Sequence, residues 1–186
     1  MATVVAALVV GVAGCSDDAS DTSVQATATT AAATTEAPTT SGAPTTTGVQ
    51  PVGFTTTAAT VTAADGEVCE LCLWVAATGE QRSRGLMGVT DLGVADGMAF
   101  VYDAPSTNQF WMRDTPTPLS IAFYAADGSF VSAADMEPCL TGTDAECARY
   151  AAAGPYTTAI EVAAGDLDEL LMAPGSTLAL LNESCP

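Results

Sequence analysis

The sequence predicts a compact α+β domain, mostly antiparallel, with two short helices and a sheet that could close partly into a barrel. Short apolar stretches alternate with polar residues, and Leu71, Leu73 and Val75 share one face of such a strand. The Asp-Gly pair at 127–128 separates two of these stretches and is typical of a tight hairpin turn. Residues 78–81 have the spacing of a capping box, which starts a helix.

The expected elements all lie in residues 61–186, in the order strand, helix, four strands, helix and strand. The strands are expected at 70–76, 97–102, 119–124, 130–134, 156–162 and 177–181. The first helix, 80–86, follows the capping box, and the second, 165–172, ends before the Pro-Gly pair at 174–175. Residues 103–106 are predicted to be a turn and 138–154 a loop. With 126 residues, this part is long enough for one hydrophobic core.

The first 60 residues predict export and attachment rather than a fold. Residues 1–15 form a short apolar run, too short to span a bilayer, and end in Val-Ala-Gly-Cys. This ending resembles a bacterial lipoprotein lipobox, in which Cys15 is acylated after the signal peptide is removed. Residues 16–60 are rich in Thr, Ala and Pro and predict a disordered tether. We therefore expect a lipid-anchored protein on the outer face of the bacterial membrane.

The charge composition excludes several functions. The chain has a net charge of −18, with 22 acidic residues, four arginines, and neither lysine nor histidine. Such a chain repels nucleic-acid phosphates, so we expect no nucleic-acid partner. Without histidine or lysine, the common general bases and Schiff-base chemistry are absent. We therefore expect a protein that is not an enzyme and has no cofactor.

The stretch 110–124 (FWMRDTPTPLSIAFY) carries the densest combination of aromatic, charged and proline residues. We expect residues 110–112 to be extended and to cross the core, which would place Trp111, Arg113, Asp114 and Thr115 at one rim of the sheet. The alternative is that 110–112 is ordinary core and that the charged pair is a solvated turn. Two further residues are assigned to the same candidate site: Arg84 and Glu161.

Glu161 is expected to neutralise Arg113 or Arg84, because four arginines are the only positive partners for 22 acids. A pair of carboxylates for glycoside hydrolysis, Asp114 or Asp103 with Glu161, is a weaker interpretation.

Several motifs together resemble the domain of unknown function 192, also called uncharacterised protein family 0127. The matching segments are 82–87 (RSRGLM), 97–100 (GMAF), 110–115 (FWMRDT), 118–121 (PLSI), and 160–162 (IEV) with Tyr156 and Gly165 around it. The chain departs from the family pattern at Arg113-Asp114, where Lys-Asn is usual, at Ser120, where Asp is usual, and at Val89, where Arg is common. The resemblance implies a mainly β fold in prokaryotic, often exported, proteins and implies no activity.

The cysteines after Cys15 are expected to form structural disulfides, as suits an exported domain. Cys139 and Cys147 bracket a short loop and are predicted to pair. Cys69 and Cys72 lie too far apart along a strand to pair with each other. One of them is expected to pair with Cys185, which would leave one free thiol. The remaining alternatives for the Cys-x-x-Cys pair are a redox motif or half of a zinc site.

The function that these residues favour is non-catalytic binding of a small ligand, a sugar or a cell-wall fragment. Trp111 offers a ring for stacking, and the polar groups beside it could orient the ligand. One alternative is Cu(I) handling by Met87, Met98 and Met112, which fall in the matching motifs, against ordinary core filling by flexible methionines. The other is a protein-interaction or structural module without a ligand pocket.

Overall fold

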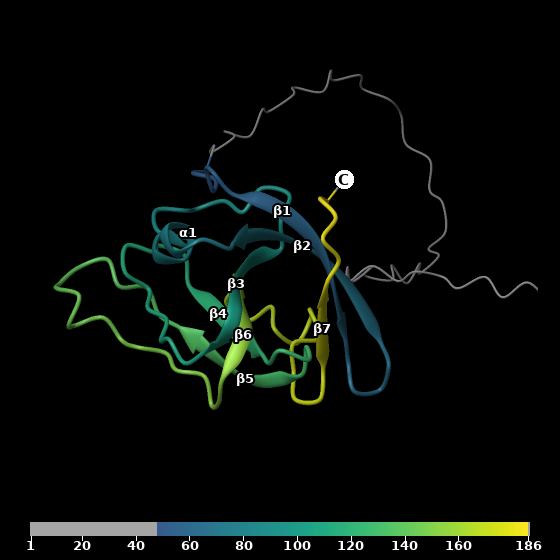
Figure 1. Cartoon of the computed structure of the whole chain (residues 1–186). Helices are drawn as coiled ribbons and strands as arrows, with labels where there is room; N and C mark the ends of the chain where they lie inside the picture. The colour runs from purple at the N-terminus through teal and green to yellow at the C-terminus, as the bar shows by residue number, and fades with distance from the viewer. Residues whose placement is uncertain (1–47, 186) are drawn as a thin grey trace, which may run out of the picture. The chain divides into compact units, whose positions relative to one another are not determined.

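The computed structural model describes residues 48–185 and has one seven-stranded sheet with a single short helix (Figure 1). The elements are β1 (Thr55–Thr62), β2 (Val68–Ala76), α1 (Gly79–Arg84), β3 (Gly97–Ser106), β4 (Leu119–Tyr124), β5 (Phe130–Met136), β6 (Tyr156–Ala163) and β7 (Thr177–Leu180). The strand order is β5-β4-β6-β3-β2-β1-β7, and every neighbouring pair is antiparallel except β2–β3.

The sheet bends strongly but does not close into a barrel. Strand β7, at one edge, approaches the turn before β5, at the other edge, through an isolated bridge between Ser129 and Thr177 (Figure 1). The Leu178 N–H also donates to the Gly128 carbonyl at 2.8 Å. Gly128 has a φ of +82°, and a Cβ there would lie 2.4 Å from the Leu178 carbonyl oxygen. A glycine is therefore needed where the two edges meet.

Side chains on the two faces of the sheet belong to two separate hydrophobic clusters. Along β4, Ile121 and Phe123 lie in one cluster, and Ala122 and Tyr124 in the other. The first cluster also contains residues from the loops after α1 and β3, and the second contains β1, β7 and the segment after β6. Because side chains alternate along a strand, the central strands β3, β4 and β6 are covered on both faces.

The capping box starts α1 as predicted. The Thr78 hydroxyl accepts from the Gln81 N–H, and the Gln81 side chain accepts from the Thr78 N–H, both at 3.1 Å. The helix ends at Gly85, whose φ is +47° and whose missing Cβ would lie 3.1 Å from the Phe100 ring. Gly85 thus lets the following loop approach the sheet closely.

The fold is mainly β, so the expected α+β class with two helices needs correction. The segment 165–172 forms consecutive turns, because its hydrogen bonds change spacing: Leu170 donates to Asp166, but Met172 donates to Leu167. Residues 103–106 are not a turn. They extend β3, which resumes pairing with β6 after a register shift. The hairpin predicted at 127–128 is present between β4 and β5.

Two boundaries also change. Strand β1 pairs with both β2 and β7, so the sheet includes residues 55–60, which we had assigned to the tether. Residues 110–112 lie outside the strands and make only an isolated bridge, between Phe110 and Tyr150. The predicted signal peptide with Cys15, and residues 16–47 of the predicted tether, lie outside the described residues.

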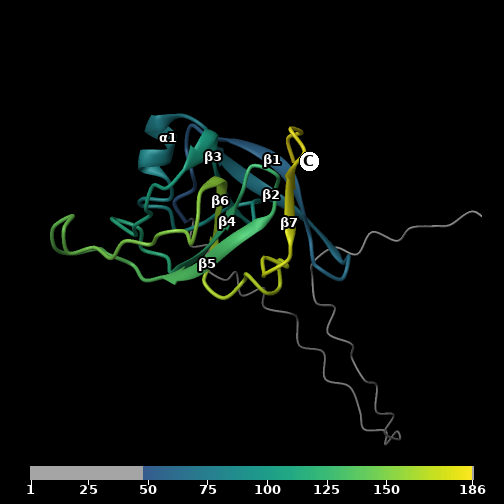
Figure 2. The ribbon, with the colours of Figure 1, turned by 60° about the horizontal axis from the view of Figure 1, so that its bottom comes forward.

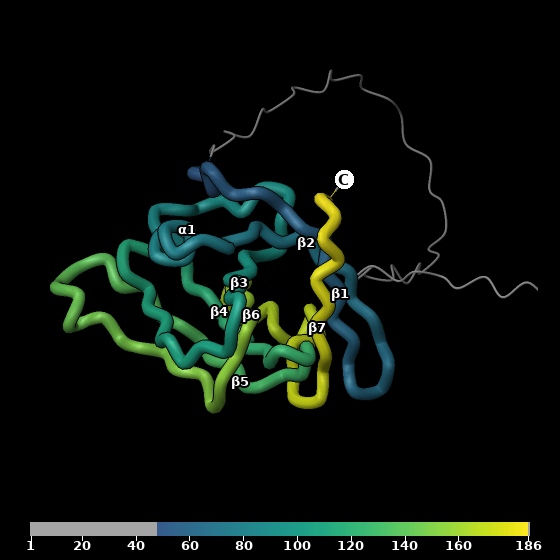
Figure 3. Tube along the Cα trace, viewed as in Figure 1, coloured from purple at the N-terminus to yellow at the C-terminus, as the bar shows by residue number. Residues whose placement is uncertain are grey.

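Two disulfides have both of their cysteines within the described residues, one across a long and one across a short sequence separation. Cys139 pairs with Cys147, as predicted, and Cys72 pairs with Cys185. The second bond attaches the C-terminal segment to β2, and Figure 3 shows that segment running beside β1. The expected free thiol is wrong, since Cys69 is also disulfide-bonded and residues 48–185 contain no free cysteine.

In the same range of residues, no helix is long and apolar enough to cross a bilayer.

We expect the two disulfides to contribute unequally to stability. Replacing Cys139 and Cys147 by Ser should lower the free energy of unfolding by about 2–3 kcal/mol, and replacing Cys72 and Cys185 by about 4–5 kcal/mol. The difference follows from the sequence separations of 8 and 113 residues, because closing a longer loop removes more entropy from the unfolded chain. Urea unfolding of both double variants measures this, and equal losses would contradict it.

Candidate functional site

A carboxylic acid lies in the middle of one apolar face of the sheet. Glu161 is on β6, where its cross-strand neighbours are Met98 on β3 and Ile121 on β4. Both neighbours are fully buried, and Glu161 itself is only 4% exposed. Its side chain makes no hydrogen bond or ion pair with any described residue. Burial without a partner raises the pKa of Glu161 from 4.5 to about 8.

A small cavity of about 30 Å³ opens beside this carboxyl group. Three aromatic residues line it, namely Phe100, Phe110 and Trp111. No side-chain oxygen or nitrogen in residues 48–185 is both completely covered and without a partner. The unpartnered carboxyl oxygens of Glu161 therefore reach open space, and this cavity is the space that Glu161 lines.

The two loops that cover the cavity are tied to each other. The loop after α1 supplies Gly85, Leu86 and Met87 to the wall, and the segment 110–115 supplies Phe110, Trp111 and Thr115. The Gly88 N–H donates to the Asp114 carbonyl at 2.8 Å and joins these two loops directly. The Thr115 hydroxyl donates to the Arg113 carbonyl at 3.2 Å, which keeps the second loop tightly turned.

Residues 110–115 are held from the other side by the loop that follows β5, which projects from the sheet in Figures 1 and 2. Phe110 and Tyr150 exchange two backbone hydrogen bonds of 2.9 Å, and the Cys139 N–H donates to the Met112 carbonyl at 3.1 Å. From this loop, Arg149 places its guanidinium 3.8 Å from the centre of the Trp111 ring. The half-buried indole is therefore stacked on a cation.

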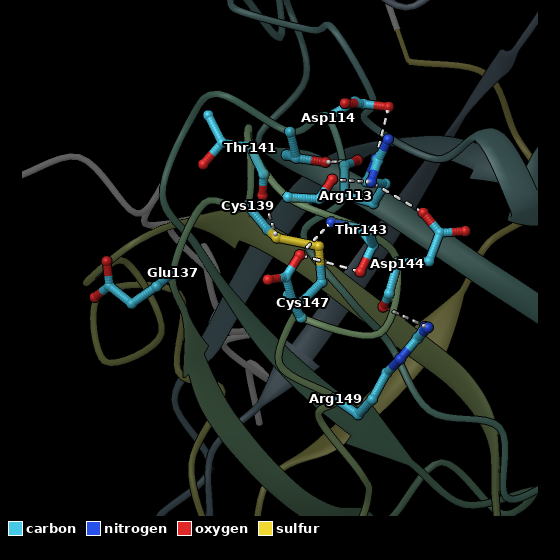
Figure 4. The surroundings of a disulfide bond; sticks show 12 residues. Arg113, Asp114, Glu137, Cys139, Thr141, Thr143, Asp144, Cys147 and Arg149 are labelled. Carbon is cyan, nitrogen blue, oxygen red and sulfur yellow. Dashed lines mark hydrogen bonds and ion pairs between the residues drawn. A yellow bond between two sulfur atoms is a disulfide. The ribbon is translucent and has the colours of Figure 1, made fainter.

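Arg113 lies between Asp114 and the loop closed by Cys139 and Cys147 (Figure 4). Arg113 forms ion pairs with Asp114 at 3.1 Å and with Asp144 at 3.0 Å, and its guanidinium also donates to the Gly142 carbonyl. Neither Arg113 nor Asp114 lines the cavity at Glu161. Their interactions hold the loop closed by Cys139 and Cys147 against residues 110–115.

A larger open groove of about 740 Å³ lies next to the small cavity. Arg82, Ser83, Phe110 and Trp111 line both, so the two hollows share a wall. The rest of the groove is formed by polar and aromatic residues from α1, β3 and the two loops: Tyr102, Thr107, Asn108, Gln109 and Arg149, with Gly79. Glu161 is the sole carboxylate that lines either hollow, within the described part of the chain.

The structure divides the residues that the sequence assigned to one site. Trp111, Thr115, Arg84 and Glu161 line the same cavity, whereas Arg113 and Asp114 lie outside it. The expected ion pair of Glu161 with Arg113 or Arg84 is absent. The guanidinium of Arg84 instead donates to the Val52 carbonyl and lies 4.4 Å from the centre of the Phe54 ring.

Sequence reasoning missed the groove residues Tyr102, Asn108, Gln109 and Arg149. The sequence carries no signal that would place Arg149, in the loop after β5, over Trp111. Ser120, where the family usually has Asp, is buried and donates to Asp135 directly across the strand pair at 2.5 Å. It thus contributes to the sheet and not to the cavity.

The three methionines of the copper interpretation do not share a cavity. Met87 lines the small cavity, while Met98 and Met112 are 0% and 1% exposed within the hydrophobic cluster. Among residues 48–185, no group of three or more His, Cys, Asp or Glu side chains is placed to hold a metal ion.

The buried acid predicts a pH-dependent stability. Below pH 4.5, Glu161 is neutral in both folded and unfolded chains, so its burial as a charged group costs nothing. Between pH 4.5 and 8, only the unfolded chain releases this proton, and the free energy of unfolding should fall on the order of 3–5 kcal/mol. The Glu161→Gln variant should lack this decrease and be more stable than the wild type at pH 8.5. Urea unfolding across this range measures both, and parallel pH profiles would contradict the assignment.

Comparisons with known proteins place the chain among uncharacterised relatives. No curated protein matches it. A solved structure from Sinorhizobium meliloti 1021, described as a candidate transcription regulator, is 25% identical and has a TM-score of 0.60, covering 70% of this chain and 97% of that one. A protein of unknown function from Novosphingobium aromaticivorans is 30% identical with a TM-score of 0.55, covering 66% of this chain and 83% of that one.

The DUF192 family model, described as "Uncharacterized ACR", matches residues 60–180. The chain therefore belongs to this family.

Proposed function

We propose that this protein is a non-catalytic binding module that takes a small polyhydroxylated ligand, a sugar or a cell-wall fragment, into the open groove beside Trp111. The observation that carries this proposal is the groove itself, about 740 Å³ in volume. That volume falls within the range of small-molecule sites, which is about 300–1,000 Å³. A protein-interaction module without a ligand would not require such a hollow.

The composition of the groove supports a sugar-like ligand. Trp111 and Tyr102 supply aromatic rings, and an apolar face of a sugar ring can stack on such a surface. Asn108 and Gln109 present both donors and acceptors, which suits hydroxyl groups that also donate and accept. Arg82 adds donors, and its guanidinium is already oriented by the Val101 carbonyl at 2.8 Å and by the Tyr102 ring.

A binding role without catalysis is supported by the small number of reactive groups. Glycoside hydrolysis usually needs two carboxylates on opposite sides of the bond, and of the described residues only Glu161 lines the groove or its cavity as a carboxylate. Asp103 and Asp114, the other candidates from the sequence, line neither hollow. The absence of lysine and histidine removes the other common bases.

We do not extend to this chain the description of the Sinorhizobium relative as a regulator. With a net charge of −18, the chain would be repelled by nucleic-acid phosphates, which argues for a ligand other than DNA or RNA.

The proposed location is the outer face of the membrane, with Cys15 as the lipid anchor and the Thr-rich segment as a tether. The two disulfides are compatible with an oxidising compartment outside the cytoplasm. An anchored, exported protein is in a position to meet cell-wall fragments, which is the reason for choosing this ligand class.

Loss of the indole should weaken binding of an N-acetylglucosamine trimer. Trp111→Ala should reduce its affinity tenfold or more, because stacking and the burial of one ring face are lost. Trp111→Phe keeps a ring and should retain most of the affinity. Calorimetric titration measures both, and thermal unfolding shows whether each variant is folded.

Trp74→Phe is the matched control, because Trp74 is the other tryptophan and does not line the groove. In that variant Trp111 is the single tryptophan, so its fluorescence should change as the trimer binds. Unchanged affinity in a folded Trp111→Ala variant, or no response of Trp111 fluorescence at saturating trimer, would refute the proposal.

A further inference from the structure

We propose that the cavity at Glu161 is a subsite for a primary ammonium group on the ligand that occupies the groove. This inference rests on the proposed function, because the cavity and the groove share a wall at Trp111 and Phe110. It adds the chemical class of the ligand: an aminated molecule rather than a purely hydroxylated or acetylated one.

The walls of the cavity combine the two features that bind ammonium groups. Phe100, Phe110 and Trp111 present aromatic rings, and rings attract a cation through their negative faces. Glu161 supplies an oxygen acceptor and, once ionised, a full negative charge at close range. The Glu161 side chain is 4% exposed and has no hydrogen-bond or ion-pair partner among the described residues, so a cationic group of the ligand could supply that partner.

No cationic side chain among residues 48–185 forms an ion pair with Glu161. Arg82 and Arg84 also line the cavity, but their guanidinium groups are engaged elsewhere. Arg82 donates to the carbonyls of Ala77 and Val101, and Arg84 donates to the carbonyl of Val52. Neither forms an ion pair with Glu161, so a positive charge from the ligand would have no competitor in direct contact.

The size of the cavity restricts the group that enters. About 30 Å³ is enough for a group the size of one water molecule, and an ammonium group at the end of a carbon chain is of that size. An acetamide or a trimethylammonium group is several times larger. The subsite should therefore select a free amine over its acetylated form.

Binding at this subsite has a defined proton balance. At pH 6, both the ligand's ammonium group and Glu161, whose pKa is about 8, are protonated before binding. When the ammonium group enters, the carboxyl group releases its proton to the solvent and becomes a carboxylate paired with the ammonium. One proton is thus released per ligand bound, and the ion pair replaces a neutral acid that had no partner.

Two sources could provide such an amine: an amino sugar or the side chain of a diamino acid in a peptide. The test uses the full chain at pH 6 and calorimetric titration in two buffers of different ionisation enthalpy, which together count the protons released. The probes are a glucosamine trimer, an N-acetylglucosamine trimer and a lysine-containing tripeptide. The glucosamine trimer should bind at least tenfold more tightly than the acetylated trimer and release close to one proton. Selective binding of the tripeptide instead would assign the same subsite to the peptide source.

Glu161→Gln keeps the shape and the hydrogen-bonding capacity of the side chain but cannot ionise. It should lose the preference for the amine and the proton release, and its urea unfolding shows whether it is folded. Glu137→Gln, an exposed position with the same change in charge, should behave like the wild type.

The outcomes separate the two proposals. If the wild type binds the acetylated trimer but shows no preference for an amine, or if the preference survives in Glu161→Gln, the subsite is refuted and the groove stands. If neither trimer binds, the sugar groove is refuted. In that case, titration with the tripeptide tests the subsite by itself. Proton release that is lost in Glu161→Gln supports the subsite, and the absence of proton release in the wild type refutes it.

Discussion

The burial of one carboxyl group without a partner among residues 48–185 is the constraint around which the rest of the site is arranged. Glu161 lies on β6 between Met98 of β3 and Ile121 of β4, where an apolar residue would cost nothing. An ionised carboxylate in such surroundings would be strongly unfavourable, and the chain avoids this by keeping the acid neutral up to about pH 8. A group of this kind lowers stability above pH 4.5, which is the reason to look for a role in binding rather than in folding.

Loops cover Glu161, and contacts outside the cavity hold these loops in place. Gly85 allows the loop after α1 to approach Phe100, and the Gly88–Asp114 hydrogen bond joins that loop to the segment with Trp111. The Cys139–Cys147 loop then holds that segment through Arg113 and Arg149. The charged residues that departed from the family pattern, Arg113 and Asp114, thus act as supports. The residues that line the two hollows are aromatic, aliphatic or uncharged polar, except for the arginines and Glu161.

This arrangement also limits what the small cavity can do alone. Its 30 Å³ admits one small group and not a whole ligand, so the proposed ligand would also have to occupy the neighbouring groove. In the proposed role, the groove would supply contact area and hydrogen bonds, and the cavity would supply a single acidic contact in apolar surroundings. Because electrostatic interactions are stronger where water is excluded, such a contact can contribute selectivity out of proportion to its size.

The sequence by itself determined six of the seven strands, the capping box of α1, the hairpin at 127–128 and the Cys139–Cys147 bond. It also grouped Arg84, Trp111, Thr115 and Glu161, which line one cavity. These features depend on local periodicity, turn chemistry or short separations, which a single sequence displays. Tertiary structure alone decided that residues 55–62 form a strand, since its Thr-Ala composition resembles the preceding segment and its pairing partners lie in β2 and β7. It also decided that Arg113 forms ion pairs with Asp114 and Asp144 rather than with Glu161, and that Arg149 stacks on Trp111. Those choices depend on which loops meet in space, and no local pattern in the chain encodes such long-range contacts.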